Sequence, residues 1–311
     1  MQVSLILMEE IVMLFLIMAM GTIVVRRGLI KANESRSVSV ILVYIVIPCV
    51  IINAFQIDYD EHVRNGLILA FVMSIVIHIL FLAATYLMKK PLNLDAIEKA
   101  TIIYPNAGIL VIPLINALLG PEYVIYSCGF VVIQLILIWT HCRKMLCEEE
   151  NFSVREILLN INIIAIIIGA GLFLLHISLP QIIIGTLNMT GVMIGPLGML
   201  LAGMVIAEKP LAKLFTDTRN YLSTFIRLII CPLLVLALFV FTDASSFVDD
   251  GKNILMTVYL ASITPACATI TSMAQLYKKD AVHASSLYVV STIFSIITMP
   301  IMIGLFDYFV K

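Results

Sequence analysis

Charged side chains are scarce in this sequence. Asp, Glu, Lys and Arg together make up 13% of the 311 residues, whereas hydrophobic residues make up 61% and the mean hydropathy is +1.09. Soluble domains carry about 25% charged residues, so this composition excludes that class. No polar stretch is long enough to form a separate soluble domain. The sequence therefore predicts an integral membrane protein, surrounded by lipid and without a nucleic-acid partner.

Carboxylates are missing from the middle of every long apolar run. Coupled transporters commonly carry protons or sodium on such residues, and an intramembrane aspartyl enzyme needs two of them. The sequence therefore predicts a protein that is not an enzyme. His141, Cys142 and Cys147 match no zinc spacing and have no evident fourth ligand. Accordingly, neither a metal nor a cofactor is predicted.

A positively charged segment is also missing before the first apolar run, where Glu9 and Glu10 stand instead. A cleavable signal peptide would carry positive charge there, so we expect the run to be a retained helix. Ten apolar runs of about 20 residues fill the chain, each the length of a membrane-spanning helix. They are approximately Leu5–Val25, Val38–Ile57, Gly66–Met88, Ala100–Leu119, Tyr123–Thr140, Ile157–Leu175, Ile182–Ala207, Tyr221–Phe241, Ile254–Leu276 and Val282–Phe306.

The basic residues alternate between the loops. Of the 19 Lys and Arg residues, 15 lie in the loops that follow the first, third, fifth, seventh and ninth runs. Three lie in the other loops or at the C-terminus, and Arg227 lies inside the eighth run. Because cytoplasmic loops are enriched in Lys and Arg, we expect a multi-pass plasma-membrane protein with both termini outside.

An odd number of helices in each half inverts the second half relative to the first. We therefore predict an inverted repeat, with residues 1–146 and 157–311 joined by a cytoplasmic linker at 147–156. The fourth run of each half supports this prediction, because Pro105 and Pro265 interrupt them at matching places.

A proline inside a helix removes a hydrogen bond and costs about 3 kcal/mol or more. If the two broken helices cross at their prolines, new half-helices begin near Asn106 and Ala266. Their two positive N-termini would then point at one place, which suits a small anion. The opposite carbonyl ends would suit a cation or a hydrogen-bond donor. The alternative is that each proline only kinks a packed helix. The predicted substrate-binding residues are Pro105, Asn106, Ala107 and Gly108 at the first break and Thr264, Pro265 and Ala266 at the second.

Several stretches resemble, in order, helices of the auxin efflux carrier family, which includes plant auxin exporters and bacterial members associated with malate and related acids. The resemblance covers most of the chain. YIVIPCVIINAF resembles the second helix, PNAGILVIPLINALLG and VVIQLILIWT the fourth and fifth, GPLGMLLAGMVIA the seventh, RLIICPLL the eighth, and TPACATITSMAQLYKKDAVHASSLYVVSTIFSIITMP the ninth and tenth.

The resemblance implies the topology shared with sodium/proton antiporters and bile-acid symporters. It also implies a scaffold of helices 1, 2, 6 and 7, a transport domain of helices 3–5 and 8–10 that moves like an elevator, and a homodimer packed through the scaffold. Gln134 matches a glutamine in the fifth helix of plant members, which adds it to the predicted site.

The chain departs from the plant pattern in three places. The start of the third helix lacks the acidic residue and lysine of plant members, the long cytoplasmic loop is absent, and Asn160-Ile161 replaces Asn-Pro. The expected substrate is therefore a small organic anion, either a malate-like or an indole acid. We expect efflux driven by the membrane potential, and a sodium- or proton-coupled symporter of the same fold is the alternative.

Three polar residues inside the other runs have open roles. Arg227 could attract an anion at the cytoplasmic entrance or snorkel to the interface. His78 could couple protons or hydrogen-bond neutrally in a packing seam. Asn53 could line the site or bond across helices, and we favour the former.

Overall fold

The computed structural model describes residues 2–31, 34–56, 60–108, 110–147, 155, 158–207 and 216–310. Within these ranges the chain is helical, and the only strand-like pairing is one isolated bridge. The all-helical membrane class predicted from composition is confirmed. Among the described residues, six helical segments are long and apolar enough to cross a membrane: Ser37–Ala54, Glu61–Met88, Pro121–Leu146, Gln181–Val205, Thr218–Thr242 and Ala281–Phe309.

In the first half of the chain the longest described helix is α4, with 28 residues, and another helix is divided in the middle. Asp95 begins the divided helix with a capping box, because its carboxylate accepts from the Glu98 amide and Glu98 accepts from the Asp95 amide. The elements are α1 (Gln2–Arg26), α2 (Ser35–Ile41), η2 (Leu42–Val46), α3 (Ile47–Ala54), α4 (Glu61–Met88), α5 (Ala96–Ile103), α6 (Val111–Leu118), η3 (Pro121–Tyr123), α7 (Val124–Leu137), η4 (Ile138–Cys142) and α8 (Arg143–Cys147).

The second half also contains a divided helix, α16 and α17, followed by the long helix α18. Asn160, Asp217 and Asp280 cap helices here by accepting from backbone amides two or three residues on. The elements are α10 (Ile161–Leu174), α11 (Gln181–Gly191), α12 (Ile194–Ala207), α14 (Thr218–Phe225), η5 (Ile226–Ile230), α15 (Cys231–Thr242), η6 (Ala244–Phe247), α16 (Gly251–Ile263), α17 (Ala268–Leu276) and α18 (Ala281–Phe309).

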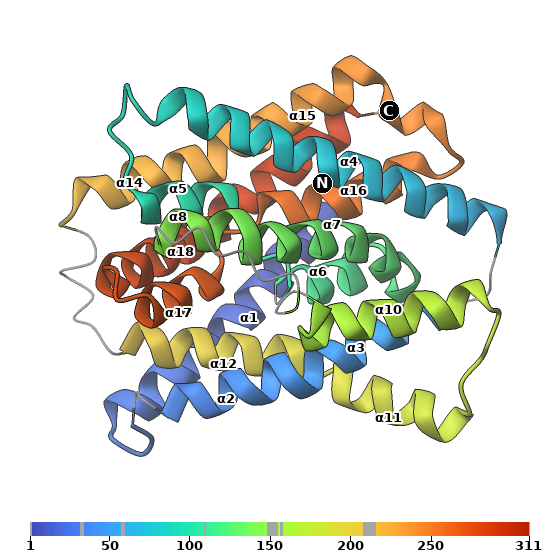
Figure 1. Ribbon diagram of the computed structural model, residues 1–311, viewed down its shortest axis with the longest axis horizontal. Coiled ribbons are helices and arrows are strands. Elements are labelled where there is room, and N and C mark those ends of the chain that lie inside the picture. The colour runs from blue at the N-terminus through green and yellow to red at the C-terminus, as the bar shows by residue number, and fades with distance from the viewer. Residues whose placement is uncertain are drawn as a thin grey trace.

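The helices form two layers, and α2, α3, α10, α11 and α12 make the lower one in Figure 1, joined by α1, which slants from the N-terminus in the upper half to the lower left. Within it α1 packs along α12, and α3 packs against α10 and α11. Glycine allows the first pair to approach closely, since a Cβ on Gly203 would lie 1.9 Å from the Met18 carbonyl oxygen. The Thr22 hydroxyl donates to the Gly203 carbonyl at 3.0 Å, which fixes the two helices together.

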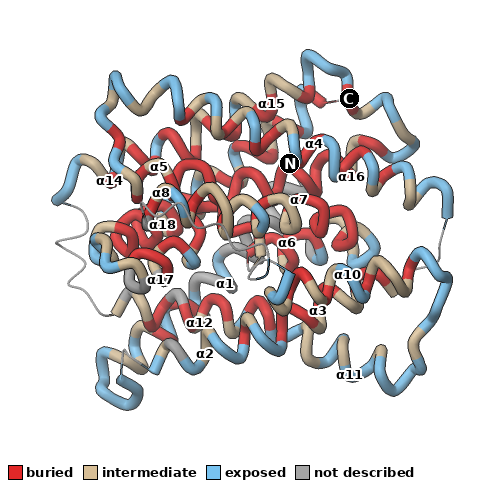
Figure 2. The backbone as a smooth tube through the Cα atoms, in the orientation of Figure 1, coloured by how far each residue is buried: buried red, intermediate tan, exposed pale blue. Residues whose placement is uncertain are grey.

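The upper layer contains α4 to α8 and α14 to α18 (Figure 1). Here α4 packs on α7, α7 on α16, and α18 on α14 and α17. Buried positions concentrate in this layer and at its seam with the lower one, whereas α11 has no buried residue (Figure 2). The divided helices therefore lie in the better buried of the two layers.

The loops gather at two opposite ends of the molecule (Figure 1). Those that follow α4 and α17 lie at the left-hand end, and those that follow α10 and α15 lie toward the right-hand end. The left-hand loops are ones in which the sequence concentrates Lys and Arg. The helices thus run from a basic end to an end poor in basic residues.

Candidate functional site

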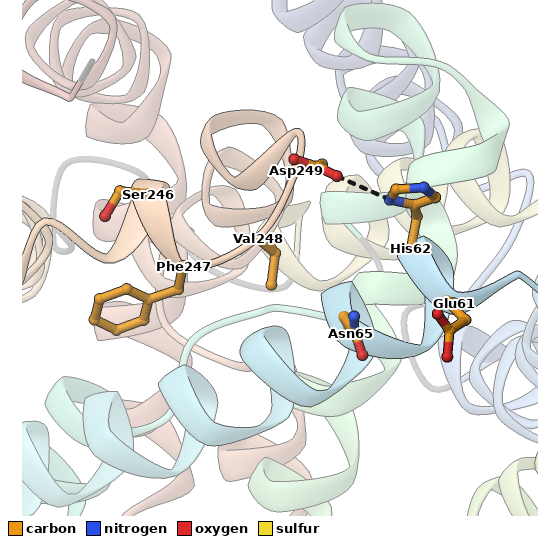
Figure 3. Close-up of a pocket in the computed structure, with 7 residues that line it drawn as sticks. All are labelled: Glu61, His62, Asn65, Ser246, Phe247, Val248 and Asp249. Atoms are coloured by element: carbon orange, nitrogen blue, oxygen red, sulfur yellow. Dashed lines mark ion pairs between the residues drawn. The ribbon is translucent and has the colours of Figure 1, made fainter.

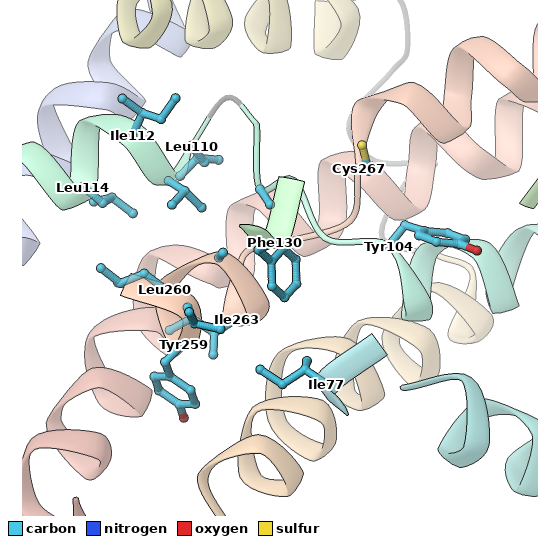
Figure 4. Packing of buried hydrophobic residues seen from close by; sticks show 14 of the residues in the cluster. Ile77, Tyr104, Leu110, Ile112, Leu114, Phe130, Tyr259, Leu260, Ile263 and Cys267 are labelled. Atoms are coloured by element: carbon cyan, nitrogen blue, oxygen red, sulfur yellow. The ribbon is translucent and has the colours of Figure 1, made fainter. Parts of the chain in front are cut away.

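The two broken helices meet at their breaks. Pro105 and Ala266 form an isolated antiparallel bridge between α5–α6 and α16–α17. The Asn106 amide donates to the Pro265 carbonyl at 2.8 Å, and the Cys267 amide donates to the Tyr104 carbonyl at 3.0 Å. Figure 4 shows Tyr104 and Cys267 on the two extended segments where these helices are interrupted. Both prolines therefore mark true interruptions with backbone pairing between them, so the alternative of simple kinks does not describe them.

The half-helices begin later than the sequence suggested at the first break. α5 ends at Ile103 and α6 begins at Val111, five residues beyond Asn106, whereas α17 begins at Ala268, two residues beyond Ala266. The chain is extended at Pro105 because the neighbouring Tyr104 carbonyl and Asn106 amide pair with the backbone of the second break. The Pro105 carbonyl itself accepts from a glutamine side chain, described next. Pro113 then lies in the first turn of α6, where proline is tolerated.

Side chains from two neighbouring helices complete the hydrogen bonding of the breaks. Gln134 on α7 donates its Nε2 to the Pro105 carbonyl at 2.8 Å. Ser291 on α18 accepts from the Ala266 amide at 3.1 Å. Gln134 was predicted as a site residue, and the structure places it against the first break. Ser291 was missed, because one serine in a long apolar helix carries no distinguishing pattern.

Asn106 is the one predicted site residue whose buried side chain has a donor without a partner. It is 2% exposed, and its Nδ2 makes no hydrogen bond among the described residues. Ala107 beside it is fully buried, whereas a Cβ on Gly108 would meet nothing within 4 Å. A buried amide donor without a partner is costly, and a ligand carboxylate would satisfy it.

Thr264 at the second break directs its polar groups differently. Its hydroxyl donates to the Ala261 carbonyl at 3.1 Å, within its own helix, and its carbonyl accepts from the Arg227 Nε at 3.0 Å. Both Thr264 and Pro265 are buried. The second break therefore presents fewer unsatisfied groups than the first.

Arg227 lies at the crossing and is 1% exposed. Besides Thr264, its guanidinium donates to the Ile102 carbonyl at 2.9 Å and to the Ser262 carbonyl. These carbonyls belong to the C-terminal ends of α5 and α16. Arg227 is thus enclosed by protein, whereas a snorkelling side chain would reach water, and it bridges both divided helices.

A narrow apolar crevice lies next to the first break, between the two layers. Gly108 and Ile112 line one side, and α3 and α10 contribute Val50, Ile51 and Ile166 to the other. Its free volume of about 10 Å³ has room for roughly one water molecule. Asn53, which we expected to line the site, is half-buried on α3 and is not among the lining residues.

His78 lies in α4 and is 1% exposed. Its Nδ1 pairs with the Ser74 carbonyl at 2.7 Å, and its ring packs against Phe130 at 4.4 Å between centroids. Its Nε2 has no hydrogen-bond partner among the described residues. The Nδ1 hydrogen bond and the Phe130 contact fit a histidine in a packing seam. The Nε2 atom is left without a hydrogen bond.

A second polar cluster joins the starts of α5, α14 and α18, and the sequence reasoning missed it. Glu98 is fully buried and accepts from Arg219 at 2.5 Å, and His283 lies 3.6 Å from an Asp95 oxygen. Ligand atoms of Asp95, Glu98 and His283 all lie within 4.8 Å of one another. Aspartate followed three residues later by glutamate is a capping-box signature, so the spacing could have located this cluster.

A more open hollow lies between the start of α4 and η6 (Figure 3). His62 and Asp249 form an ion pair of 3.1 Å across it, with side chains 65% and 84% exposed. Exposed pairs contribute little stability, and none of the predicted site residues lines this hollow. The crossing of the divided helices is therefore the better candidate site.

Comparison with known proteins gives one decisive match. A family model described as membrane transport protein matches residues 6–156 and 143–303. The chain belongs to the auxin efflux carrier family. Membership confirms the resemblance read from the helices, and it makes the chain a membrane transporter. A search of curated proteins finds no match to it.

Within an auxin efflux carrier, the crossing has the features of a transport site. It lies inside the better buried layer, it joins two interrupted helices, and it borders the seam between the layers. Irregular backbone at membrane depth is tolerated only where protein buries it or where it lines a cavity. Both conditions hold at the first break.

Proposed function

We propose that this protein is a secondary transporter that binds a small organic anion at the crossing of the divided helices. The observation that carries the proposal is the unpartnered Nδ2 of Asn106, buried next to the Pro105–Ala266 bridge. A carboxylate accepts hydrogen bonds only, so it complements this donor. In this proposal Thr264 holds the second break. The residues that shape the site around Asn106 are Pro105, Ala107, Gly108, Gln134, Pro265 and Ala266.

The helix ends give the site its charge preference. α17 begins two residues beyond Ala266 and α6 five residues beyond Asn106, and each helix N-terminus carries about half a positive charge. The substrate can therefore be an anion without a lysine or arginine in direct contact with it. A malate-like acid and an indole acid are both candidates, and the apolar crevice beside Gly108 favours a substrate with an apolar part.

Movement of the upper layer against the lower one provides alternating access in this proposal. The crevice between the layers has room for roughly one water, so a larger solute passes only if the layers shift. The lower layer corresponds to the scaffold and the upper layer to the transport domain of an elevator. The proposed topology has ten spans in two inverted repeats, with the basic loops in the cytoplasm and both termini outside. The homodimer through scaffold helices stays a prediction.

Membrane potential is the proposed driving force for efflux. An inside-negative potential contributes about 2.3 kcal/mol per charge per 100 mV, which suffices to export a monovalent anion without a coupled ion. A proton-coupled symporter is the second candidate, and the observation that favours it is the buried, unpartnered Nε2 of His78. Flux into proteoliposomes separates the two: an imposed potential drives the first, and a pH gradient drives the second.

Substrate binding is tested by a thermal-shift screen of the purified protein against mono- and dicarboxylates, indole-3-acetate and amino acids. We expect at least one carboxylate to stabilise the protein and Asn106→Ala to abolish that shift. A hydrogen bond to a charged group is worth about 1.5–3 kcal/mol, so affinity should fall about 10- to 100-fold. Ser223→Ala is the matched control, because Ser223 is also buried without a hydroxyl partner but lies on α14. A carboxylate shift that persists in Asn106→Ala would contradict the site.

A further inference from the structure

Arg227 is the largest fully buried side chain in the described chain. Its Cζ lies 5.0 Å from the centroid of the Phe81 ring, which adds a cation–π contact on one face. No carboxylate pairs with it within the described residues. A buried cation without a carboxylate partner is costly unless other groups compensate its charge.

Backbone carbonyls supply that compensation. The three carbonyls that accept from Arg227, those of Ile102, Ser262 and Thr264, lie at the C-terminal ends of α5 and α16. Each helix C-terminus carries about half a negative charge. Two such ends sum to about one negative charge, which one guanidinium neutralises.

In transporters with divided helices, these carbonyl ends are where a coupled cation is coordinated. We propose that Arg227 is a resident cation that permanently occupies this position, so that the crossing is charge-balanced without sodium or another transported cation. This inference deepens the proposed function and rests on it for its meaning in transport. The placement of the guanidinium, however, is independent of which substrate binds.

The proposal predicts what happens when the side chain is removed. Arg227→Ala would leave three carbonyl oxygens around an emptied space at two negative helix ends. Carbonyl oxygen and water are suitable ligands for hard cations. The variant should therefore acquire a saturable dependence on a small alkali cation that the wild-type protein lacks.

Arg227→Lys is the charge-conserving control. An ammonium group supplies three donors and a positive charge, although without the planar geometry of guanidinium. It should be less stable than the wild type and equally indifferent to cations. Ser223→Ala is the second control. Ser223 lies one helical turn before Arg227, and its substitution leaves the three carbonyls paired with the guanidinium.

The experiment measures melting temperature in detergent as lithium, sodium or potassium chloride replaces N-methyl-glucamine chloride at constant ionic strength. We expect the melting temperature of Arg227→Ala to rise by several degrees and to saturate with cation concentration. We expect no saturable rise for the wild type, Arg227→Lys or Ser223→Ala. Free guanidinium at millimolar concentration should also raise the melting temperature of Arg227→Ala. If that variant cannot be purified, Arg227→Gln takes its place.

Two results would overturn the proposal: a saturable alkali-cation shift in the wild-type protein, or the absence of any such shift in both Arg227→Ala and Arg227→Gln. These readouts need no substrate. If no carboxylate binds but the cation shifts follow the expectation, the proposed function fails while the resident cation stands. If a carboxylate binds and the cation shifts are absent, the proposed function stands and the resident cation fails.

Discussion

The two breaks are matched in position but differ in how fully their polar groups are satisfied. The second spans Thr264 to Cys267, and a guanidinium, a serine hydroxyl and the opposite backbone engage its amides and carbonyls. The first is longer, from Tyr104 to Leu110, and it includes the unpartnered Nδ2 of Asn106 and the open space beside Gly108.

This difference teaches how a pseudo-symmetric crossing can divide its tasks. A buried break that is fully hydrogen-bonded is rigid, because any movement breaks bonds that water cannot replace. A break that leaves a donor unsatisfied is ready for a ligand. We infer that the second break anchors the crossing and that the first recognises the substrate.

The largest effect that separates the breaks is expected from Gln134→Leu. The substitution removes the donor to the Pro105 carbonyl and leaves that carbonyl buried without a partner, at a cost of about 1–3 kcal/mol. Because the distortion falls on the recognising break, initial flux in proteoliposomes should drop at least tenfold. The leucine variant should still elute as a folded protein in size-exclusion chromatography. Unchanged flux would assign recognition elsewhere.

A smaller effect on stability, with transport retained, is expected from Ser291→Ala. The Ala266 amide loses its acceptor, which should lower the free energy of unfolding by about 1–2 kcal/mol. The melting temperature in detergent measures this loss. Flux per folded molecule should stay within about twofold of the wild type. A selective loss of substrate affinity would show that the second break also recognises the substrate.

The smallest effect is expected from Thr264→Val, which keeps the side-chain shape and removes the hydroxyl. That hydroxyl donates only to the Ala261 carbonyl of its own helix, so stability should change by about 1 kcal/mol or less. Substrate-induced thermal shifts should be unchanged. A lost shift would mean that the Thr264 hydroxyl turns toward the ligand, and the two breaks would then be equivalent in recognition.

The fold class and the place of the breaks could be predicted because each depends on a local rule. Apolar runs of about 20 residues predict membrane helices, and Pro105 and Pro265 at matching positions indicated where the backbone would be interrupted. The pairing of these breaks through Pro105 and Ala266 follows from the same symmetry. Family resemblance added Gln134, which contacts the first break.

The partners that come from distant helices could not be predicted. Arg227 is 35 and 125 residues away from the Ser262 and Ile102 carbonyls that it binds, and its spacing from them follows no periodic pattern. Ser291 has the same origin in tertiary packing. The start of α6 was missed for a different reason: Tyr104 and Asn106 pair with the second break, and the chain then turns at Ala107 and Gly108 before the helix begins.

Arg227 and the carbonyls it binds all belong to the upper layer, on η5, α5 and α16. If that layer carries the substrate across, the guanidinium travels with it as a gating charge. Because a helix dipole balances the crossing locally but carries no net charge, the substrate-free carrier would cross the electric field with the positive charge of the guanidinium. The carrier loaded with a monovalent anion would cross nearly neutral. Voltage would act on the return of the empty carrier, visible as a transient displacement current before any substrate is added.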